Sequence, residues 1–211
     1  MKMIDRRGKF ISFEGAEGSG KSTQSEMAYR YLKSRGKKVL FIREPGGVKI
    51  SEKIRAILLD VANKEMGDEC ETLLYMAARA QLVHDVIEPA LKKGMIVLCD
   101  RFLDSTIVYQ GYGNGVDIDF IKKVGAFATR GIKPDLTFVF DIDAKKGLSR
   151  IKRPKDRIER RALAYHRRVR NGYLQLARQE PRRIKRIVVN KSKEEIQAVV
   201  QGYLGQLLNM K

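Results

Sequence analysis

An apolar run that leads into a glycine-rich loop limits the folds open to this chain more than any other feature. The run Lys9–Glu14 precedes Gly15-Ala-Glu-Gly-Ser-Gly-Lys-Ser22, which fits G-x-x-x-x-G-K-[ST] and opens a helical stretch. Glycines let backbone N–H groups converge on phosphate oxygens, and the start of the helix adds a favourable dipole. We therefore expect a phosphate-binding loop, with Lys21 bridging the β- and γ-phosphates of a nucleoside triphosphate. The residues expected to bind ATP are Gly15, Ala16, Glu17, Gly18, Ser19, Gly20, Lys21, Ser22 and Thr23.

Short apolar runs alternate with longer stretches of helical period along the rest of the chain. Strands are expected at Lys9–Glu14, Val39–Glu44, Met95–Asp100, Leu136–Asp141 and Arg186–Asn190, and helices near Lys21–Ser34, Ser51–Asp60, Glu71–Leu91, Asp117–Thr129, Arg160–Arg178 and Glu194–Met210. This alternation predicts an α/β fold of the P-loop NTPase class, a five-stranded parallel sheet with helices on both faces. A length of 211 residues, 43% of them hydrophobic, suits one such domain over 1–211.

A carboxylate stands at the end of one predicted strand, where a metal ligand is needed. The run Met-Ile-Val-Leu-Cys-Asp100 ends in Asp100, and the Ser22 hydroxyl opens the first helix. We expect Ser22 and Asp100 to hold Mg²⁺. Asp141 at the end of Leu136–Asp141 is the alternative metal-side acid, and it is less favoured because Arg101 adds a phosphate-binding fork beside Asp100.

Arginines suited to a second anion occur at four places. They are Arg43, Arg55, Arg79 and Arg101, in segments that follow strand ends or begin flanking helices. Arg43 and Arg101 adjoin the carboxyl ends of predicted strands, where open α/β sheets bind ligands. A phosphate-binding loop alone does not separate a kinase from a GTPase or a motor, so this second anion site decides in favour of a phosphotransferase.

The net charge of +18 is concentrated in one part of the chain. Between Lys145 and Lys191 there are 18 lysines and arginines against three acids. Such a stretch indicates a bound polyanion or a solvated helix surface. Nucleic acid is the less favoured ligand, because the sequence has no zinc-finger spacing, no aromatic RNP-type segment and no long basic tail.

The two cysteines and the hydropathy pattern favour a cytoplasmic protein that does not enter a membrane. No stretch approaches the roughly 20 apolar residues that span a bilayer. Cys99 lies inside an apolar strand and Cys70 lies in an unrelated setting, so we expect thiols rather than a disulfide or a metal site.

Further motifs follow the phosphate-binding loop in a fixed order. They are Arg43-Glu-Pro-Gly-Gly47, Tyr75-Met-Ala-Ala-Arg79, Asp100-Arg101-Phe-Leu-Asp-Ser-Thr106-Ile-Val-Tyr-Gln110-Gly, Pro134-Asp135-Leu, Asp156-Arg157-Ile-Glu159 and His166-Arg-Arg-Val-Arg-Asn-Gly-Tyr-Leu174. In this combination and spacing the chain resembles bacterial thymidylate kinases over nearly its whole length. The resemblance implies transfer of the γ-phosphoryl group of ATP to thymidine monophosphate in dTTP synthesis, with Mg²⁺, by a homodimer.

The resemblance also implies roles for the residues that match. Tyr75 stands where the family has an aromatic residue that stacks on thymine, and a phenol ring can serve the same purpose. Arg79 would donate to thymine O4, Gln110 would pair with N3 and Thr106 would lie beside the base. The residues implied for the acceptor phosphate are Arg43, Arg55 and Arg101, and Glu17 is implied near the 3′-hydroxyl of the sugar.

A lid is implied over the triphosphate, at approximately residues 149–159. Thymidylate kinases without arginine in the phosphate-binding loop carry catalytic arginine in the lid, and this loop, Ala16-Glu17-Gly18-Ser19, has none. Arg153 is the first choice for that role and Arg157 the second, beside Lys21 and Arg101 as the other catalytic residues. The chain departs from the family at Arg160-Arg161, where acidic residues or glutamine are usual.

Two other functions stay open from the residues. A kinase for another nucleotide would differ in the base pocket of Tyr75, Arg79, Thr106 and Gln110, which suits thymine or uracil and not cytosine. A nucleic-acid-binding NTPase would use the basic stretch Lys145–Lys191 as its groove, and its ATP turnover would respond to DNA or RNA.

Overall fold

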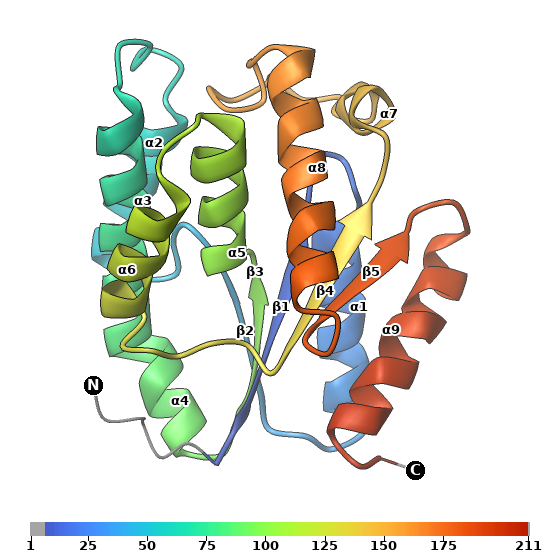
Figure 1. Cartoon of the computed structure of the whole chain (residues 1–211). Helices are drawn as coiled ribbons and strands as arrows, with labels where there is room; N and C mark the ends of the chain where they lie inside the picture. Colours follow the sequence, from blue (N-terminus) through green and yellow to red (C-terminus); the bar gives the residue numbers. More distant parts are fainter. Residues whose placement is uncertain (1–6, 211) are drawn as a thin grey trace.

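The computed structural model describes residues 7–210, and its strands form one parallel sheet (Figure 1). The strands are β1 (Lys9–Gly15), β2 (Val39–Arg43), β3 (Ile96–Asp100), β4 (Leu136–Asp141) and β5 (Ile184–Val188), in the order β2-β3-β1-β4-β5. Asp100 pairs in register with Phe13 of β1 and with Arg43 of β2. The carboxyl ends of these strands therefore meet at one edge of the sheet, as parallel strands require.

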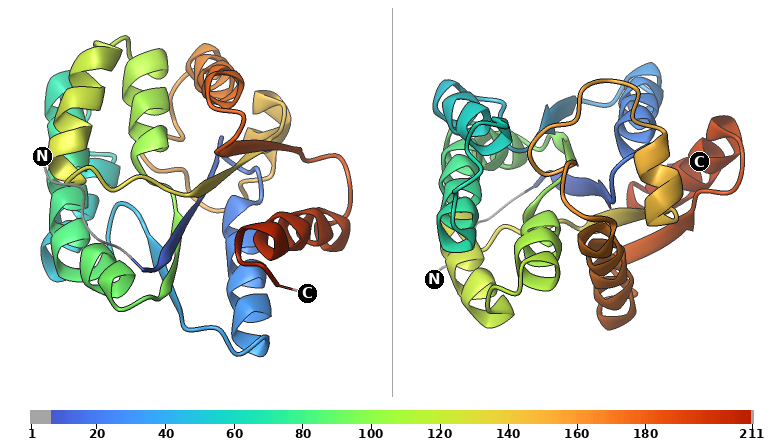
Figure 2. Two further views of the ribbon diagram at one scale, coloured as in Figure 1. Left: turned by 60° about the horizontal axis from the view of Figure 1, so that its bottom comes forward. Right: turned by 90° about the horizontal axis from the view of Figure 1, so that it is seen from above.

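Alternating side chains of β1 decide how the sheet is covered. Ile11 and Phe13 point to one face, where helices α1 (Lys21–Ser34) and α9 (Lys193–Leu207) bury them. Phe10 points to the opposite face, which is covered by the helices that follow β2 and β3 and by α8. Figure 2 shows α1 and α9 side by side on one side of the sheet and the other large helices across it. The period of two along the strand produces this three-layer arrangement.

The remaining helices surround the carboxyl edge and the second face of the sheet. They are α2 (Lys49–Leu59), α3 (Asp68–Leu82), the π-helical segment η1 (Val83–Ile87), α4 (Glu88–Lys92), α5 (Leu103–Thr106), the π-helical segment η2 (Ile107–Gly113), α6 (Ile118–Ala128), α7 (Ala144–Ser149) and α8 (Leu163–Gln179). Two loops at the carboxyl edge are important for the site. One is the phosphate-binding loop between β1 and α1, and the other runs from α7 to α8.

The predicted α/β fold with five parallel strands is confirmed, and several boundaries were wrong. β5 begins at Ile184 instead of Arg186, because Ile184 and Ile187 are the side chains that pack into the core. The helix predicted over Glu71–Leu91 divides into α3, η1 and α4. Neither α7 nor the helical pair α5 and η2 was predicted, since the run Ile107–Gly113 is rich in β-branched and glycine residues, which favour strands and turns.

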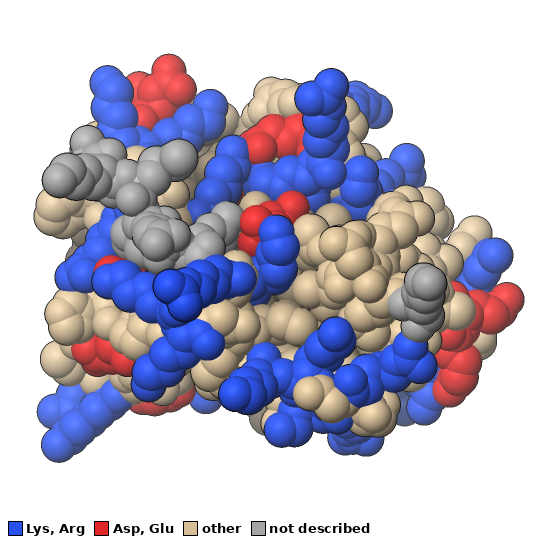
Figure 3. All heavy atoms as spheres, turned by 90° about the horizontal axis from the view of Figure 1, so that it is seen from below, with Lys and Arg blue, Asp and Glu red and all other residues tan. Residues whose placement is uncertain are grey.

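Several arginines of the basic stretch Lys145–Lys191 pair with buried acids. Arg170 and Arg186 both bind Asp141, and Arg183 binds Asp104 at 2.6 Å. Figure 3 shows lysines and arginines spread over the face where the strands begin, away from the carboxyl edge of the sheet. Helices of a parallel α/β fold end at that face, and basic groups there offset the negative ends of their dipoles.

Two further predictions from the sequence concern the state of the cysteines and membrane-spanning helices. Cys99 is buried in β3 and Cys70 is exposed in α3, and both are free thiols. Within residues 7–210, no helix combines the length and the hydropathy that crossing a bilayer demands.

Candidate functional site

The phosphate-binding loop connects the carboxyl end of β1 to the first turn of α1. Lys21, the first residue of α1, is buried, and the loop approaches α7 very closely. A Cβ atom on Gly18 would lie 2.0 Å from the carbonyl oxygen of Gly147, and one on Gly147 would lie 2.3 Å from the carbonyl oxygen of Glu17. Only glycine fits at either position, so the loop and α7 are held in backbone contact.

Ser22 and Asp100 meet at the carboxyl edge, as a metal site would require. The Ser22 hydroxyl donates to Asp100 Oδ2, while Asp100 Oδ1 is buried without a hydrogen-bond partner among the described residues. The alternative acid, Asp141, is bound by Arg170 and Arg186 on both of its oxygens. Burial would raise the pKa of Asp141, but these two guanidinium groups lower it below its ordinary value. Asp141 is therefore the charge partner of two arginines, and Asp100 has an oxygen available to a cation.

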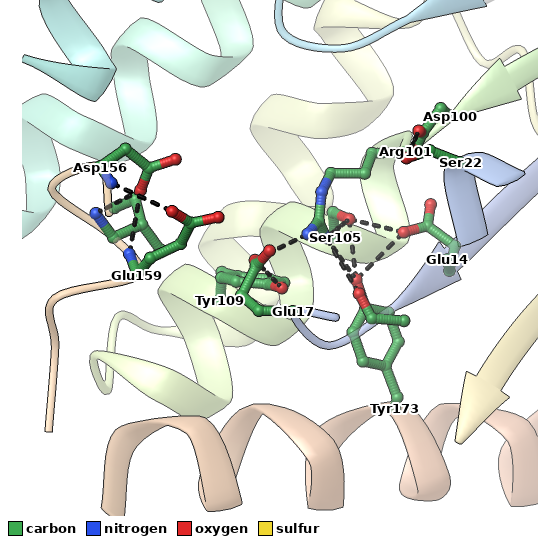
Figure 4. A network of polar contacts seen from close by, with 12 residues as sticks. Glu14, Glu17, Ser22, Asp100, Arg101, Ser105, Tyr109, Asp156, Glu159 and Tyr173 are labelled. Carbon is green, nitrogen blue, oxygen red and sulfur yellow. Dashed lines mark hydrogen bonds and ion pairs between the residues drawn. The ribbon is translucent and has the colours of Figure 1, made fainter. Parts of the chain in front are cut away.

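Arg101 lies at the centre of the site (Figure 4). Its Nη2 donates to Glu17 Oε1 at 2.7 Å, and the Tyr109 hydroxyl donates to the same oxygen at 2.7 Å. The guanidinium carbon lies 4.8 Å from the centre of the Tyr109 ring. Arg101 also has a φ of 71°, which is unusual for a residue with a side chain, so its contacts must hold a strained backbone.

Glu17 carries a negative charge into the phosphate-binding loop. Burial alone would raise its pKa, but the charges of Arg101 and Lys21 and the hydrogen bond from Tyr109 outweigh this effect and lower it to about 2. The ion pair with Arg101 is nearly buried on both sides. Glu17 therefore fixes the guanidinium of Arg101 beside the loop.

Glu14 of β1 is a buried acid that binds three groups close to Arg101. Its carboxylate accepts hydrogen bonds from the Phe102 amide at 2.7 Å, the Ser105 hydroxyl at 2.5 Å and the Tyr173 hydroxyl at 3.1 Å. Burial, and then the charge of Asp104, raise the pKa of Glu14 to about 8. The sequence analysis did not identify Glu14 as a site residue, although an acid inside an apolar strand was a signal that it needs partners.

Two arginines line the pocket from the end of β2 and from α2, Arg43 exposed and Arg55 half-buried. Arg43 forms an ion pair with Glu52 at 3.1 Å, and Arg55 donates to the Pro45 carbonyl at 2.8 Å. Both line the same pocket as Lys21 and Arg101. The geometry therefore brings the predicted arginines together with the phosphate-binding loop.

Arg79 is buried and extensively hydrogen-bonded. Its Nε donates to Glu44 Oε2 at 2.8 Å, Nη1 donates to Thr106 Oγ1 at 3.0 Å, and Nη2 donates to the Phe102 carbonyl at 3.1 Å. Glu44 Oε1 is buried without a hydrogen-bond partner among the described residues. Arg79 is thus rigidly placed at the pocket wall, and Thr106 is tied to it.

The segment predicted as a lid contains three arginines, of which Arg153 lines the pocket and Arg150 donates to the Gly18 carbonyl at 3.3 Å. Arg153 binds Glu159 through two hydrogen bonds of 2.9 and 2.7 Å and lines the pocket. Arg157 instead donates to the Leu58 carbonyl at 2.8 Å and pairs with Glu71 at 2.5 Å. Of the two lid arginines expected to be catalytic, Arg153 lines the pocket and Arg157 does not.

One pocket is lined by 12 of the 19 predicted site residues. Those that line it are Glu17, Lys21, Ser22, Arg43, Arg55, Tyr75, Arg79, Asp100, Arg101, Thr106, Gln110 and Arg153. Those outside its lining are Gly15, Ala16, Gly18, Ser19, Gly20, Thr23 and Arg157. Acidic and aromatic lining residues that the sequence analysis did not assign to the site are Glu44, Tyr109, Asp156 and Glu159. Asp156 and Glu159 belong to the motif Asp156-Arg157-Ile-Glu159. Two acids among the arginines of this segment were a sign in the sequence that they pair with those arginines.

Comparisons with known proteins agree with one another. The model of the family described as "Thymidylate kinase" matches residues 13–200. A thymidylate kinase of Halothermothrix orenii is 52% identical over 195 residues, covering 90% of this chain and 93% of that protein. One of Symbiobacterium thermophilum is 45% identical over 200 residues, with 94% of each chain covered. The crystal structure of thymidylate kinase from Ehrlichia chaffeensis has a TM-score of 0.78 and 32% identity, covering 93% of this chain and 98% of that one.

The low pKa of Glu17 predicts a pH-dependent contribution to stability. Since its pKa is about 2 in the folded chain and 4.5 ordinarily, Glu17 stabilises the fold above pH 4.5 and loses this effect as the pH falls toward 2. The variant Glu17→Gln is expected to lower the free energy of unfolding by about 3 kcal/mol at pH 7. Urea denaturation of both proteins across this pH range measures the difference. A difference that stays constant from pH 7 to pH 3 would contradict the argument.

Proposed function

Since the chain belongs to the thymidylate kinase family, we propose that its site transfers the γ-phosphoryl group of ATP to thymidine monophosphate, giving thymidine diphosphate and ADP. One observation carries the proposal. The pocket that Lys21 and Ser22 line from the phosphate-binding loop is the pocket that Arg43, Arg55 and Arg101 line from the other strands. A donor phosphate and an acceptor phosphate can therefore share one cavity, which transfer between them requires.

Lys21 and the loop bind the donor. The backbone amides of the loop cradle the phosphates, and the Lys21 ammonium group neutralises charge on the β- and γ-phosphates. The unpartnered Asp100 Oδ1 and the Ser22 hydroxyl fit a hard cation with oxygen ligands, so these two residues would hold Mg²⁺. When bound, the ion supplies positive charge that offsets the developing negative charge of the transferred group.

The acceptor lies against the β2 and α3 side of the pocket. Arg43, Arg55 and Arg101 hold its phosphate, and Glu17 meets the sugar near the 3′-hydroxyl. Tyr75 stacks on the base, while Arg79, Thr106 and Gln110 face its polar edge. The hydrogen bonds that fix Arg79 support this assignment, because a donor held in place by three partners selects a base by the position of its carbonyl oxygen.

Arg153 is the residue we assign to the transferred phosphoryl group. The segment 149–159 acts as a lid, and the absence of arginine in the loop Ala16-Glu17-Gly18-Ser19 supports membership of the subtype with arginine in the lid. Arg157, paired with Glu71 and the Leu58 carbonyl, anchors the lid. The transfer is in line and needs no covalent intermediate, since Lys21, Arg101 and Arg153 stabilise the charge that develops.

A homodimer and a cytoplasmic location complete the proposal. The free thiols of Cys70 and Cys99 suit a reducing compartment. Leu73 on α3 and Phe120 and Phe127 on α6 are large apolar residues exposed on two helices that pack together. A shared apolar face of this kind suits a two-fold interface.

A charged substitution on the proposed apolar interface tests whether the chain is a dimer. Phe127, whose side chain is 80% exposed, touches little within one chain, so Phe127→Asp is expected to leave the fold intact and to convert a dimer into a 24.1 kDa monomer. Sedimentation velocity of both proteins measures this change. A wild-type chain that already sediments as a monomer would refute the dimer.

The proposed reaction is tested by a coupled ADP-release assay with ATP, Mg²⁺ and a panel of nucleoside monophosphates. Thymidine monophosphate is expected to give the highest kcat/KM, and Lys21→Ala is expected to abolish turnover without unfolding the chain. A preference for another monophosphate would replace the acceptor. ATP turnover that appears only with DNA or RNA would instead indicate a nucleic-acid-dependent NTPase.

The role of Arg153 is tested by comparison with a neighbour in the same segment. Arg153→Ala is expected to lower kcat by about 10³-fold or more with little change in KM, because an arginine that meets transition-state charge contributes on this scale. Lys152→Ala, an exposed cation one residue away, is the matched control and should keep kcat within about twofold. An effect of Arg153→Ala on KM alone would make Arg153 a binding residue.

A further inference from the structure

Glu71 of α3 is a fully buried carboxylate that joins Gln110 to Arg157 in the proposed lid and to Arg161 just after it. Its Oε1 accepts hydrogen bonds from Gln110 Nε2 at 2.8 Å and from Asn114 Nδ2 at 3.2 Å. Its Oε2 accepts from Arg161 Nη2 at 2.8 Å and pairs with Arg157 Nη2 at 2.5 Å. Two guanidinium groups therefore compensate the buried charge, and two amide groups occupy its other oxygen.

This arrangement decides which way the amide of Gln110 points. A carboxylate only accepts hydrogen bonds, so the group of Gln110 that faces Glu71 must be its NH₂. Gln110 is buried and lines the pocket, so its remaining polar atom on the pocket side is the carbonyl oxygen Oε1. Without Glu71 an amide side chain can turn over and present either atom, because the two ends have nearly the same shape.

We infer that Glu71 is a positioning residue for base selection, acting through Gln110. The inference rests on the proposed function and deepens it. A fixed acceptor at Oε1 matches a pyrimidine whose N3 carries a proton, as in thymine and uracil. It opposes cytosine, whose N3 is an acceptor, because two acceptors would face each other in a buried site.

The two arginines make the orientation resistant to change. Arg157 and Arg161 come from the segment that follows the lid arginine, and both lie on the Oε2 side of Glu71. Asn114 is fixed in the same sense, since its Nδ2 donates to Asp68 at 2.7 Å and its Oδ1 accepts from Arg161. The hydrogen bonds of Asn114 and Arg161 are thus consistent with Gln110 donating to Glu71.

The variant Glu71→Gln tests the inference with a predictable geometry. The arginines can only donate, so they hold the carbonyl oxygen of the new glutamine on their side and leave its NH₂ toward Gln110, while Asn114 gives up its 3.2 Å contact and keeps its hydrogen bond to Asp68. Gln110 must then accept with Oε1 and turn its own NH₂ to the base. The ratio of kcat/KM for thymidine monophosphate to that for deoxycytidine monophosphate is expected to fall at least about tenfold, through KM more than kcat.

Two further variants separate positioning from general damage. Asp68→Asn removes a negative charge from the same cluster, where Asp68 touches Asn114 and Arg161, and should leave the ratio unchanged. In a Gln110→Ala background, Glu71→Gln should no longer change the ratio, because the residue through which it acts is gone. An equal loss of discrimination with and without Gln110, or an unchanged ratio in Glu71→Gln, would overturn the inference.

A measurement on the wild-type chain decides the matter if Glu71→Gln does not fold. The side-chain amide protons of Gln110, observed by ¹⁵N NMR, should exchange slowly with water both with and without thymidine monophosphate. Fast exchange that slows only when the nucleotide binds would place the NH₂ on the base and overturn the inference. A wild-type chain that does not prefer thymidine monophosphate would refute the proposed function, while the exchange measurement would still test the orientation of Gln110.

Discussion

The ion pair between Arg101 and Glu17 is the interaction on which the rest of the site depends. It links the residue after β3 to the phosphate-binding loop, two segments that are 84 positions apart in the chain. Because Arg101 adopts a strained backbone conformation, the pair and the contacts of Glu14 with Phe102 and Ser105 must offset that strain. The same contacts also orient the guanidinium group of Arg101 toward the pocket.

Four of the five arginines that line the pocket form an ion pair with an acidic residue. Arg43 pairs with Glu52, Arg79 with Glu44, Arg101 with Glu17 and Arg153 with Glu159. Each carboxylate lowers the freedom of a long side chain and fixes the direction of its donors. The positive charge that we propose binds phosphates is therefore ordered by folding, before an anionic ligand binds.

The sequence was most informative where function depends on local spacing. The phosphate-binding loop, the strand that ends at Asp100 and the arginines at strand ends follow from periodicity and from the rule that parallel strands end at one edge. The residues that hold them were not predictable in this way. Glu44 reaches Arg79 over 35 positions and Glu71 reaches Arg161 over 90, and no local pattern records such pairings. The helical pair α5 and η2 was missed because burial against α8 overrides its weak helical propensity.

The contact between Gly18 and Gly147 gives the site a mechanical property. Gly147 belongs to α7, the helix that precedes the segment proposed as a lid, and its backbone touches the phosphate-binding loop. In the proposed function the segment 149–159 closes over the donor phosphates, and this movement would start from a helix whose backbone contacts the phosphate-binding loop. A side chain at either glycine would push the two backbones apart and displace that segment. The two positions are 129 residues apart in the chain and form one backbone contact in which both residues must be glycine.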